Sequence, residues 1–266
     1  MVDRYKNTFE KLKREKRFAF CPFAVLGDPN EAESLARIKK YISHADMLEL
    51  GIPFSDPIAD GPVIQAASMR ALEAGMTPQR AINLIKKIRA IAIQQAKNDL
   101  PIGILTYANI VFRYGIQRFY RHLKAAGADS VLIADVPLEE IAPFAAAAKS
   151  TKLAQIFLAS DYTTPRRLKQ IERISGSKNL GYLYVVSTLG VTGTRGEVAK
   201  STLTLLNRLK KQTKLPLVVG FGISKPAHLS SLKKLGAVSG AIVGSALVKT
   251  KTADLKMALM SLQHAC

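Results

Sequence analysis

The chain has 266 residues, 48% of them hydrophobic, which is enough to bury a full core in one large barrel or in two small domains. No stretch approaches the roughly 20 uncharged apolar residues of a membrane span, and the N-terminus lacks the apolar region and cleavage site of a signal peptide, so we expect a cytoplasmic protein without membrane contact. The formal charge of +19 makes nucleic-acid binding an alternative, and the positions of the charged residues along the chain help to decide it.

The positive charge is concentrated towards the C-terminus. Residues 1–60 hold ten Lys or Arg and ten Asp or Glu, residues 61–150 hold eleven and six, and residues 151–266 hold eighteen and four. The excess falls mostly on predicted helices, as at Arg166 and Arg167, without the interleaved aromatic residues of a single-strand binder. We therefore interpret it as a solvated outer surface that favours an anionic substrate, and we expect no nucleic-acid partner.

The predicted elements alternate between strand and helix along the chain. An amphipathic helix over about residues 3–15 comes first. Eight short apolar runs follow, and they are continuous rather than alternating, as in a parallel sheet that is covered on both faces. These runs are residues 18–26, 46–52, 102–108, 130–136, 153–159, 180–187, 215–223 and 239–245.

Helical patterns separate these strands, with apolar residues three or four positions apart, as at Leu35, Ile38 and Ile42. Eight strand-then-helix units in a chain of this length predict an α/β fold, a single (β/α)₈ TIM barrel over residues 1–266 with an extra N-terminal helix. An open doubly wound sheet is the alternative, but the chain has no dinucleotide-type GxGxxG turn.

Two carboxylates stand out near the end of the second strand, where such barrels carry part of their active site. Glu49 lies within an apolar run, and Asp60 follows eleven residues later. A carboxylate in apolar surroundings costs several kcal/mol unless it is paired or used, and desolvation raises its pKa towards a value suited to proton transfer. The alternatives are a structural ion pair or cap for Glu49 and a turn former for Asp60.

Glycines mark the ends of the seventh and eighth strands, in GFGIS (residues 220–224) and VGSAL (residues 243–247). Glycine lets backbone N–H groups approach a ligand, and a helix that begins at Ser245 points its positive end at a phosphate group. Tight packing of strand against helix is the alternative. The glycine-containing loop at residues 187–197 is a candidate lid, although a flexible connector has the same composition.

The run LELGIPFSDPIADGPVIQ (residues 48–65) resembles the signature of the tryptophan synthase alpha family. Further similar segments occur in family order along nearly the whole chain, namely PFAVLGDP, TYAN, ADVPLEE, GYLYVVSTLGVTG, GFGIS and GSALVK. The resemblance implies a lyase of tryptophan biosynthesis that splits indole-3-glycerol phosphate into indole and glyceraldehyde 3-phosphate.

The resemblance also implies roles for individual residues. Glu49 is the acid–base group that moves protons during retro-aldol cleavage, Asp60 stays ionised and holds the indole N–H, and Tyr184 lines the site beside Glu49. The implied substrate contacts are Phe23, Leu105 and Leu132 around the indole ring, Thr192 as the residue that orients Asp60, and Gly193, Gly222, Gly244 and Ser245 around the phosphate. Ordinary core packing is an equally open alternative for the apolar members of this set.

No cofactor or metal is implied for this chain, and Cys21 and Cys266 lack the spacing of a metal or redox site. The implied partner is a tryptophan synthase beta chain that carries pyridoxal phosphate, in an alpha2beta2 tetramer. Pro53 and Asp56, in the turn after Glu49, are the implied interface residues. A rigid surface turn that only holds Asp60 is the alternative.

Three other functions stay open from the residues alone. Another phosphate-binding barrel, such as an isomerase or the synthase that makes indole-3-glycerol phosphate, does not need the segment 48–65. A catalytically idle subunit that only activates a beta chain does not need both Glu49 and Asp60. The third alternative is a basic nucleic-acid-binding barrel.

Overall fold

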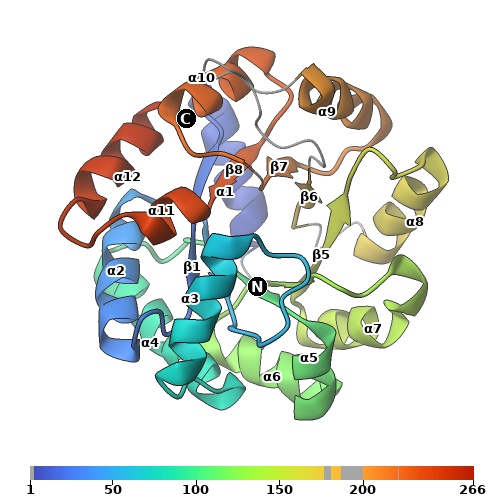
Figure 1. Cartoon of the computed structure of the whole chain (residues 1–266). Coiled ribbons are helices and arrows are strands. Elements are labelled where there is room, and N and C mark those ends of the chain that lie inside the picture. Colours follow the sequence, from blue (N-terminus) through green and yellow to red (C-terminus); the bar gives the residue numbers. More distant parts are fainter. Residues whose placement is uncertain (1–2, 177–180, 187–199, 221) are drawn as a thin grey trace.

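The computed structural model describes residues 3–176, 181–186, 200–220 and 222–266. Eight parallel strands pair in chain order and the eighth pairs with the first, so that the sheet closes into a barrel (Figure 1). This confirms the predicted (β/α)₈ barrel and rules out the open sheet. The strands are β1 (Ala19–Val25), β2 (Leu48–Gly51), β3 (Ile102–Thr106), β4 (Ser130–Ile133), β5 (Ala154–Ala159), β6 (Leu183–Val185), β7 (Leu217–Val219) and β8 (Gly240–Val243).

Helices cover the outside of the barrel (Figure 1). Several begin at residues suited to that position: Thr77 and Thr164 each accept a hydrogen bond from a backbone N–H of the first turn, and proline follows each of them. The helices are α1 (Arg4–Arg14), α2 (Glu31–His44), α3 (Pro62–Glu73), α4 (Pro78–Gln94), α5 (Ala108–Tyr114), α6 (Ile116–Ala126), η1 (Leu138–Glu140), α7 (Ala142–Thr151), α8 (Pro165–Ser175), α9 (Lys200–Gln212), α10 (Pro226–Leu235), α11 (Ser245–Lys249) and α12 (Leu255–His264).

The helix α1 closes the N-terminal end of the barrel, and in Figure 1 it lies at the centre of the ring. Its buried Tyr5 places the hydroxyl oxygen 2.7 Å from Ser130 Oγ, and its ring meets that of Tyr182 edge to face at 5.5 Å. A Cβ atom on Gly103 would come within 2.9 Å of Ser130 Oγ, so glycine is needed for this close approach. The interior of the barrel is therefore covered at this end, and the cavity that reaches Glu49 lies at the carboxyl ends of the strands.

The two strands that differ most from prediction are β6 and β7, which cover only the middle of the expected runs 180–187 and 215–223. Apolar residues continue past the last strand pairing because they line the interior and the mouth of the barrel. An apolar run alone does not mark where the pairing stops.

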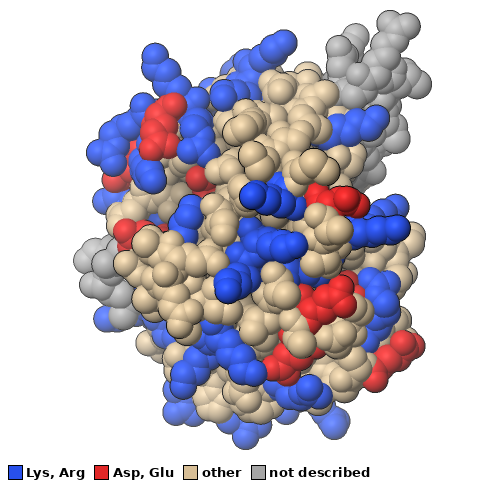
Figure 2. Space-filling view, turned by 90° about the vertical axis from the view of Figure 1, so that its left-hand side faces the viewer, with Lys and Arg blue, Asp and Glu red and all other residues tan. Residues whose placement is uncertain are grey.

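No helix in the described parts of the chain is long and apolar enough to cross a membrane. On the face that carries α2 and α12, Lys and Arg side chains are spread among acidic and uncharged ones rather than joined in one band (Figure 2). This face therefore lacks the continuous basic stripe that is typical of a nucleic-acid interface.

Candidate active site

Glu49 lies inside the barrel on β2, paired in register with Phe23 of β1 and Gly103 of β3. Alternate residues of a barrel strand point inwards, which leaves the neighbouring Leu48 and Leu50 to pack outwards against the helices. The Glu49 residue is only 2% exposed. The strand therefore holds a carboxyl group in the core of the barrel.

The surroundings of Glu49 favour its protonated form. Tyr182 donates a 3.1 Å hydrogen bond to Oε1, whereas Oε2 is buried with no hydrogen-bond partner among the described residues. Burial raises the pKa of Glu49 to about 8, the hydrogen bond from Tyr182 lowers it, and the charge of Asp60 raises it. A group with this pKa changes protonation state near neutral pH, as general acid–base chemistry requires.

Asp60 lies in the loop between β2 and α3 and is partly buried. Its Oδ2 accepts a 2.8 Å hydrogen bond from the hydroxyl group of Tyr107, and its backbone carbonyl accepts one from Gln65 Nε2 at 2.9 Å. Burial raises the pKa of Asp60, while the hydrogen bond from Tyr107 lowers it. The side chain is thus held in one direction by a group that favours its ionised form.

One cavity of about 690 Å³ at the carboxyl end of the barrel contains both carboxylates. Its walls include Phe23, Leu105 and Leu132, the three residues predicted for the indole slot. A largely apolar cavity of this size with a few convergent polar groups has the character of a small-molecule site. The predicted catalytic pair and the predicted apolar slot therefore lie in the same space.

The same cavity is also lined by the glycine turns that end β7 and β8. Gly222, Gly244 and Ser245 all line it, and Gly222 has a φ of +73°, a conformation that favours glycine. The short helix α11 begins at Ser245, directly after Gly244. Unpaired backbone N–H groups of a first helical turn attract anions, so this wall provides the chemistry expected for a phosphate group.

Two tyrosines of the sixth strand region reach the interior. Tyr184 lines the cavity with Glu49, as predicted, and its hydroxyl group donates to the Gly220 carbonyl at 3.2 Å. Tyr182, which was not predicted, is the tyrosine with the hydrogen bond to Glu49. The strand period of two was a signal for it, because Tyr182 and Tyr184 must lie on the same face.

Tyr107, the partner of Asp60, was also missed. It lies within the segment TYAN directly after β3, but nothing in that segment shows that its hydroxyl group reaches the loop after β2. The predicted orienting residue, Thr192, and the predicted phosphate contact Gly193 lie outside the described residues, as does the whole of the predicted lid loop 187–197.

The predicted interface turn connects directly to the site. Pro53 is buried within this chain, whereas Asp56 is exposed. Phe54 stacks on the ring of Tyr107 at a centroid distance of 4.9 Å, and Tyr107 in turn binds Asp60. The turn and the carboxylate are thus joined through one aromatic residue. In the described parts of the chain, no group of three or more His, Cys, Asp or Glu is arranged to hold a metal ion.

The chain is similar to known proteins along nearly its whole length. The family model described as "Tryptophan synthase alpha chain" matches residues 9–264. The tryptophan synthase alpha chain of Shewanella amazonensis is 48% identical over 249 residues, which cover 93% of this chain and 90% of the relative. That of Shewanella baltica is 47% identical over 247 residues, covering 92% and 87%. The crystal structure of tryptophan synthase subunit alpha from Legionella pneumophila is similar with a TM-score of 0.86 and 31% identity, over 100% of this chain and 98% of that one.

Proposed function

The chain belongs to the tryptophan synthase alpha chain family, which carries out a lyase step of tryptophan biosynthesis, and we propose that this step takes place in the cavity that holds Glu49 and Asp60. In this step, indole-3-glycerol phosphate undergoes retro-aldol cleavage to indole and glyceraldehyde 3-phosphate. The observation that carries the proposal is the pair of differently held carboxylates in one cavity that is lined by both apolar side chains and glycine turns.

Glu49 is the group that moves the protons. Its protonated carboxyl group donates to C3 of the indole ring, which leaves a positive charge on the ring nitrogen. The resulting carboxylate takes the proton of the hydroxyl group on the adjoining glycerol carbon as the C–C bond breaks. The bonding electrons return to the ring, indole leaves, and the carbon that carried the deprotonated hydroxyl group becomes the aldehyde carbon. A pKa of about 8 lets one group serve in both directions.

Asp60 stabilises the positive charge that develops on the ring. Its carboxylate accepts the indole N–H, and Tyr107 holds it in the ionised form by donating to Oδ2. Two acids are needed because one must change its protonation state during the reaction and the other must stay negative. Their environments differ accordingly, since Glu49 is fully enclosed and Asp60 is only partly buried.

The remaining walls position the substrate. The ring lies between Phe23, Leu105 and Leu132, and Tyr184 supports it from β6. The phosphate group lies against the glycine turns and the first turn of α11, with Gly222, Gly244 and Ser245 as the contacts in the described part of the chain, and Gly193 and Thr192 are proposed to complete the site from outside it.

The partner is a tryptophan synthase beta chain, as expected for the family. We propose an alpha2beta2 assembly in the cytoplasm, with pyridoxal phosphate in the beta chain, and with residues 1–266 of this chain forming one domain. The turn containing Pro53 and Asp56 takes part in the interface. Its support is the exposed Asp56 and the stacking of Phe54 on Tyr107, which links the turn to Asp60.

The decisive experiment is to incubate the purified chain with indole-3-glycerol phosphate and to measure indole, with and without a beta chain. We expect release from the isolated chain, and a loss of about 10²-fold or more in Glu49→Gln, which keeps the volume of the side chain but removes proton transfer. A chain that produces no indole alone yet stimulates a beta chain would instead be an idle activating subunit.

A further inference from the structure

A second cleft, of about 530 Å³, lies at the N-terminal end of the barrel, opposite the Glu49 cavity. It is formed by the start of α1 and the last turns of α6, α7 and α8. Five cationic side chains and only two carboxylates line it. They are Arg4, Lys124, Lys149, Lys152 and Arg173, with Asp3 and Asp129.

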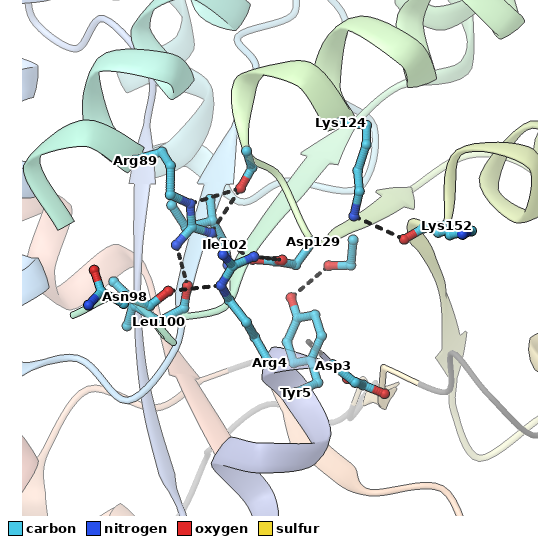
Figure 3. A network of polar contacts seen from close by, with 12 residues as sticks. Asp3, Arg4, Tyr5, Arg89, Asn98, Leu100, Ile102, Lys124, Asp129 and Lys152 are labelled. Atoms are coloured by element: carbon cyan, nitrogen blue, oxygen red, sulfur yellow. Dashed lines mark hydrogen bonds and ion pairs between the residues drawn. The ribbon is translucent and has the colours of Figure 1, made fainter. Parts of the chain in front are cut away.

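Both carboxylates already have partners. Asp129 accepts from Arg4 through Oδ1 at 2.8 Å and from Arg89 through Oδ2 at 2.7 Å, and Figure 3 shows the two guanidinium groups converging on it. Asp3 caps the first turn of α1 by accepting a backbone N–H of that turn. One carboxylate is thus shared by two arginines, and among the described residues neither acid forms an ion pair with a lysine of the cleft.

Lys124 is a partly buried cation of the cleft. Its Nζ donates to the backbone carbonyl of Lys152 at 3.1 Å, and among the described residues it has no ion pair (Figure 3). Burial lowers the pKa of Lys124, the charge of Asp129 raises it, and the charges of Arg4, Arg89 and Lys152 lower it. A bound anion would stabilise a partly buried cation that lies beside other cations.

Helix dipoles explain only part of this arrangement. A cation in the last turn of a helix is stabilised by the dipole, which accounts for Lys124, Lys149 and Arg173. The dipole opposes a cation in the first turn, yet Arg4 occupies that place in α1. Lys152 ends α7 with a φ of +57°, in the left-handed region where α6 and α8 end with glycine. Lys16 after α1 has a similar φ of +56°, so the backbone at Lys152 shows only that glycine would suit this position.

We propose that this cleft is a second anion site, which binds a compact phosphate anion carrying two or more charges. The guanidinium group of arginine can donate two parallel hydrogen bonds, and the ammonium group of lysine is a compact positive charge. Phosphate oxygens accept hydrogen bonds from both groups. The cleft has the volume of a small-molecule site rather than the extended stripe of a nucleic-acid interface. The site is separate from the phosphate wall at Gly244, which lies at the other end of the barrel, and does not depend on the reaction proposed there.

The test is a titration of the full chain with inorganic pyrophosphate, monitored by amide hydrogen exchange. The protection of each region then measures the affinity of pyrophosphate for that region. Protection is expected at residues 149–153 and 173–176. Lys152→Gly and Lys149→Ala should each weaken that protection about tenfold, since each removes one charge-assisted contact. Lys152→Gly should also leave the chain at least as stable and its cleavage kinetics unchanged, because glycine suits the backbone at that position.

The matched control is Lys256→Ala, which removes the same charge from an exposed position on α12. It should leave the protection of residues 149–153 unchanged. The proposal is overturned if Lys256→Ala weakens protection as much as the cleft variants do, since the attraction would then be a general effect of net charge. It is equally overturned if pyrophosphate protects only the turns around Gly222 and Gly244.

Discussion

The hydroxyl group of Tyr182 donates a 3.1 Å hydrogen bond to Oε1 of Glu49, and both side chains are buried in the centre of the barrel. The carboxyl group is thereby tied at one oxygen, while Oε2 has no partner in the described parts of the chain. In the proposed mechanism, this second oxygen is the one that acts on the substrate. The hydrogen bond from Tyr182 also lowers the pKa of Glu49, because it favours the ionised form and opposes the larger effect of burial.

Replacing Tyr182 by phenylalanine should move the pH dependence of cleavage. Loss of the hydrogen bond raises the pKa of Glu49, so the alkaline fall in kcat/KM, where the required acid form is lost, should shift from near pH 8 to higher pH. Tyr5→Phe is the matched control, because it removes a buried hydroxyl group that faces Ser130 instead. If the alkaline limb of the pH profile is unchanged in Tyr182→Phe, or shifts equally in Tyr5→Phe, then this hydrogen bond does not lower the pKa of Glu49.

Glu49 should make the folded chain less stable as the pH rises. Between pH 4.5 and about 8 the unfolded chain has lost this proton and the folded chain has kept it, so unfolding becomes easier with increasing pH. The slope from this one group is at most about 1.4 kcal/mol per pH unit and vanishes above its folded pKa. Urea unfolding of Glu49→Gln should lack this component, so parallel stability curves for the two proteins would contradict the assigned pKa.

Asp60→Asn and Tyr107→Phe should differ in the size of their effect. The first removes the charge that faces the ring nitrogen, and we expect a loss of about 10²-fold or more in kcat. The second leaves the charge but releases its 2.8 Å hydrogen bond, so a loss of about tenfold is expected. Steady-state kinetics of both variants test whether the loss of kcat is larger in Asp60→Asn than in Tyr107→Phe. Near-normal turnover in Asp60→Asn would remove the residue from the mechanism.

The phosphate wall can be tested at Gly244. A Cβ atom there would lie 3.4 Å from the ring of Phe23, an ordinary contact, so the fold has room for a Cβ atom. Gly244→Val should nevertheless raise KM by obstructing the approach of the phosphate to the backbone, and Gly244→Ala should raise it less. Inorganic phosphate should compete with the substrate in the wild type and only weakly in the valine variant. Equal inhibition of both proteins would place the phosphate elsewhere.

Asp56→Ala should leave the isolated chain folded, because the side chain is exposed and its hydrogen bond is to the adjacent Ser55. It should weaken binding of a beta chain and reduce the stimulation of cleavage by that chain. Titration of a beta chain into wild type and variant, with indole release as the signal, measures both effects. The exposed Lys86→Ala on α4 is the control for the general loss of one exposed charged side chain. Equal stimulation of wild type and Asp56→Ala would show that the turn takes no part in the coupling.

The sequence by itself determined the architecture and the central acid. Eight continuous apolar runs alternating with helical patterns are sufficient for a closed barrel, because such runs are buried on both faces and each following helix covers the outside. Glu49 could be identified for the same reason, since a carboxylate in an apolar strand is exceptional. The glycine turns after β7 and β8 could be recognised because these two strands are neighbours in a barrel, so the turns at their carboxyl ends lie close together.

Only the tertiary structure decided which side chains meet. Tyr182 reaches Glu49 from a position 133 residues away, and Tyr107 reaches Asp60 from 47 residues away, so no local pattern relates either pair. The cations of the N-terminal cleft come from α1, α6, α7 and α8, and along the chain they are indistinguishable from any other solvated lysine or arginine. Hydrogen bonds and electrostatic fields depend on distances in space, and closure of the barrel sets these distances.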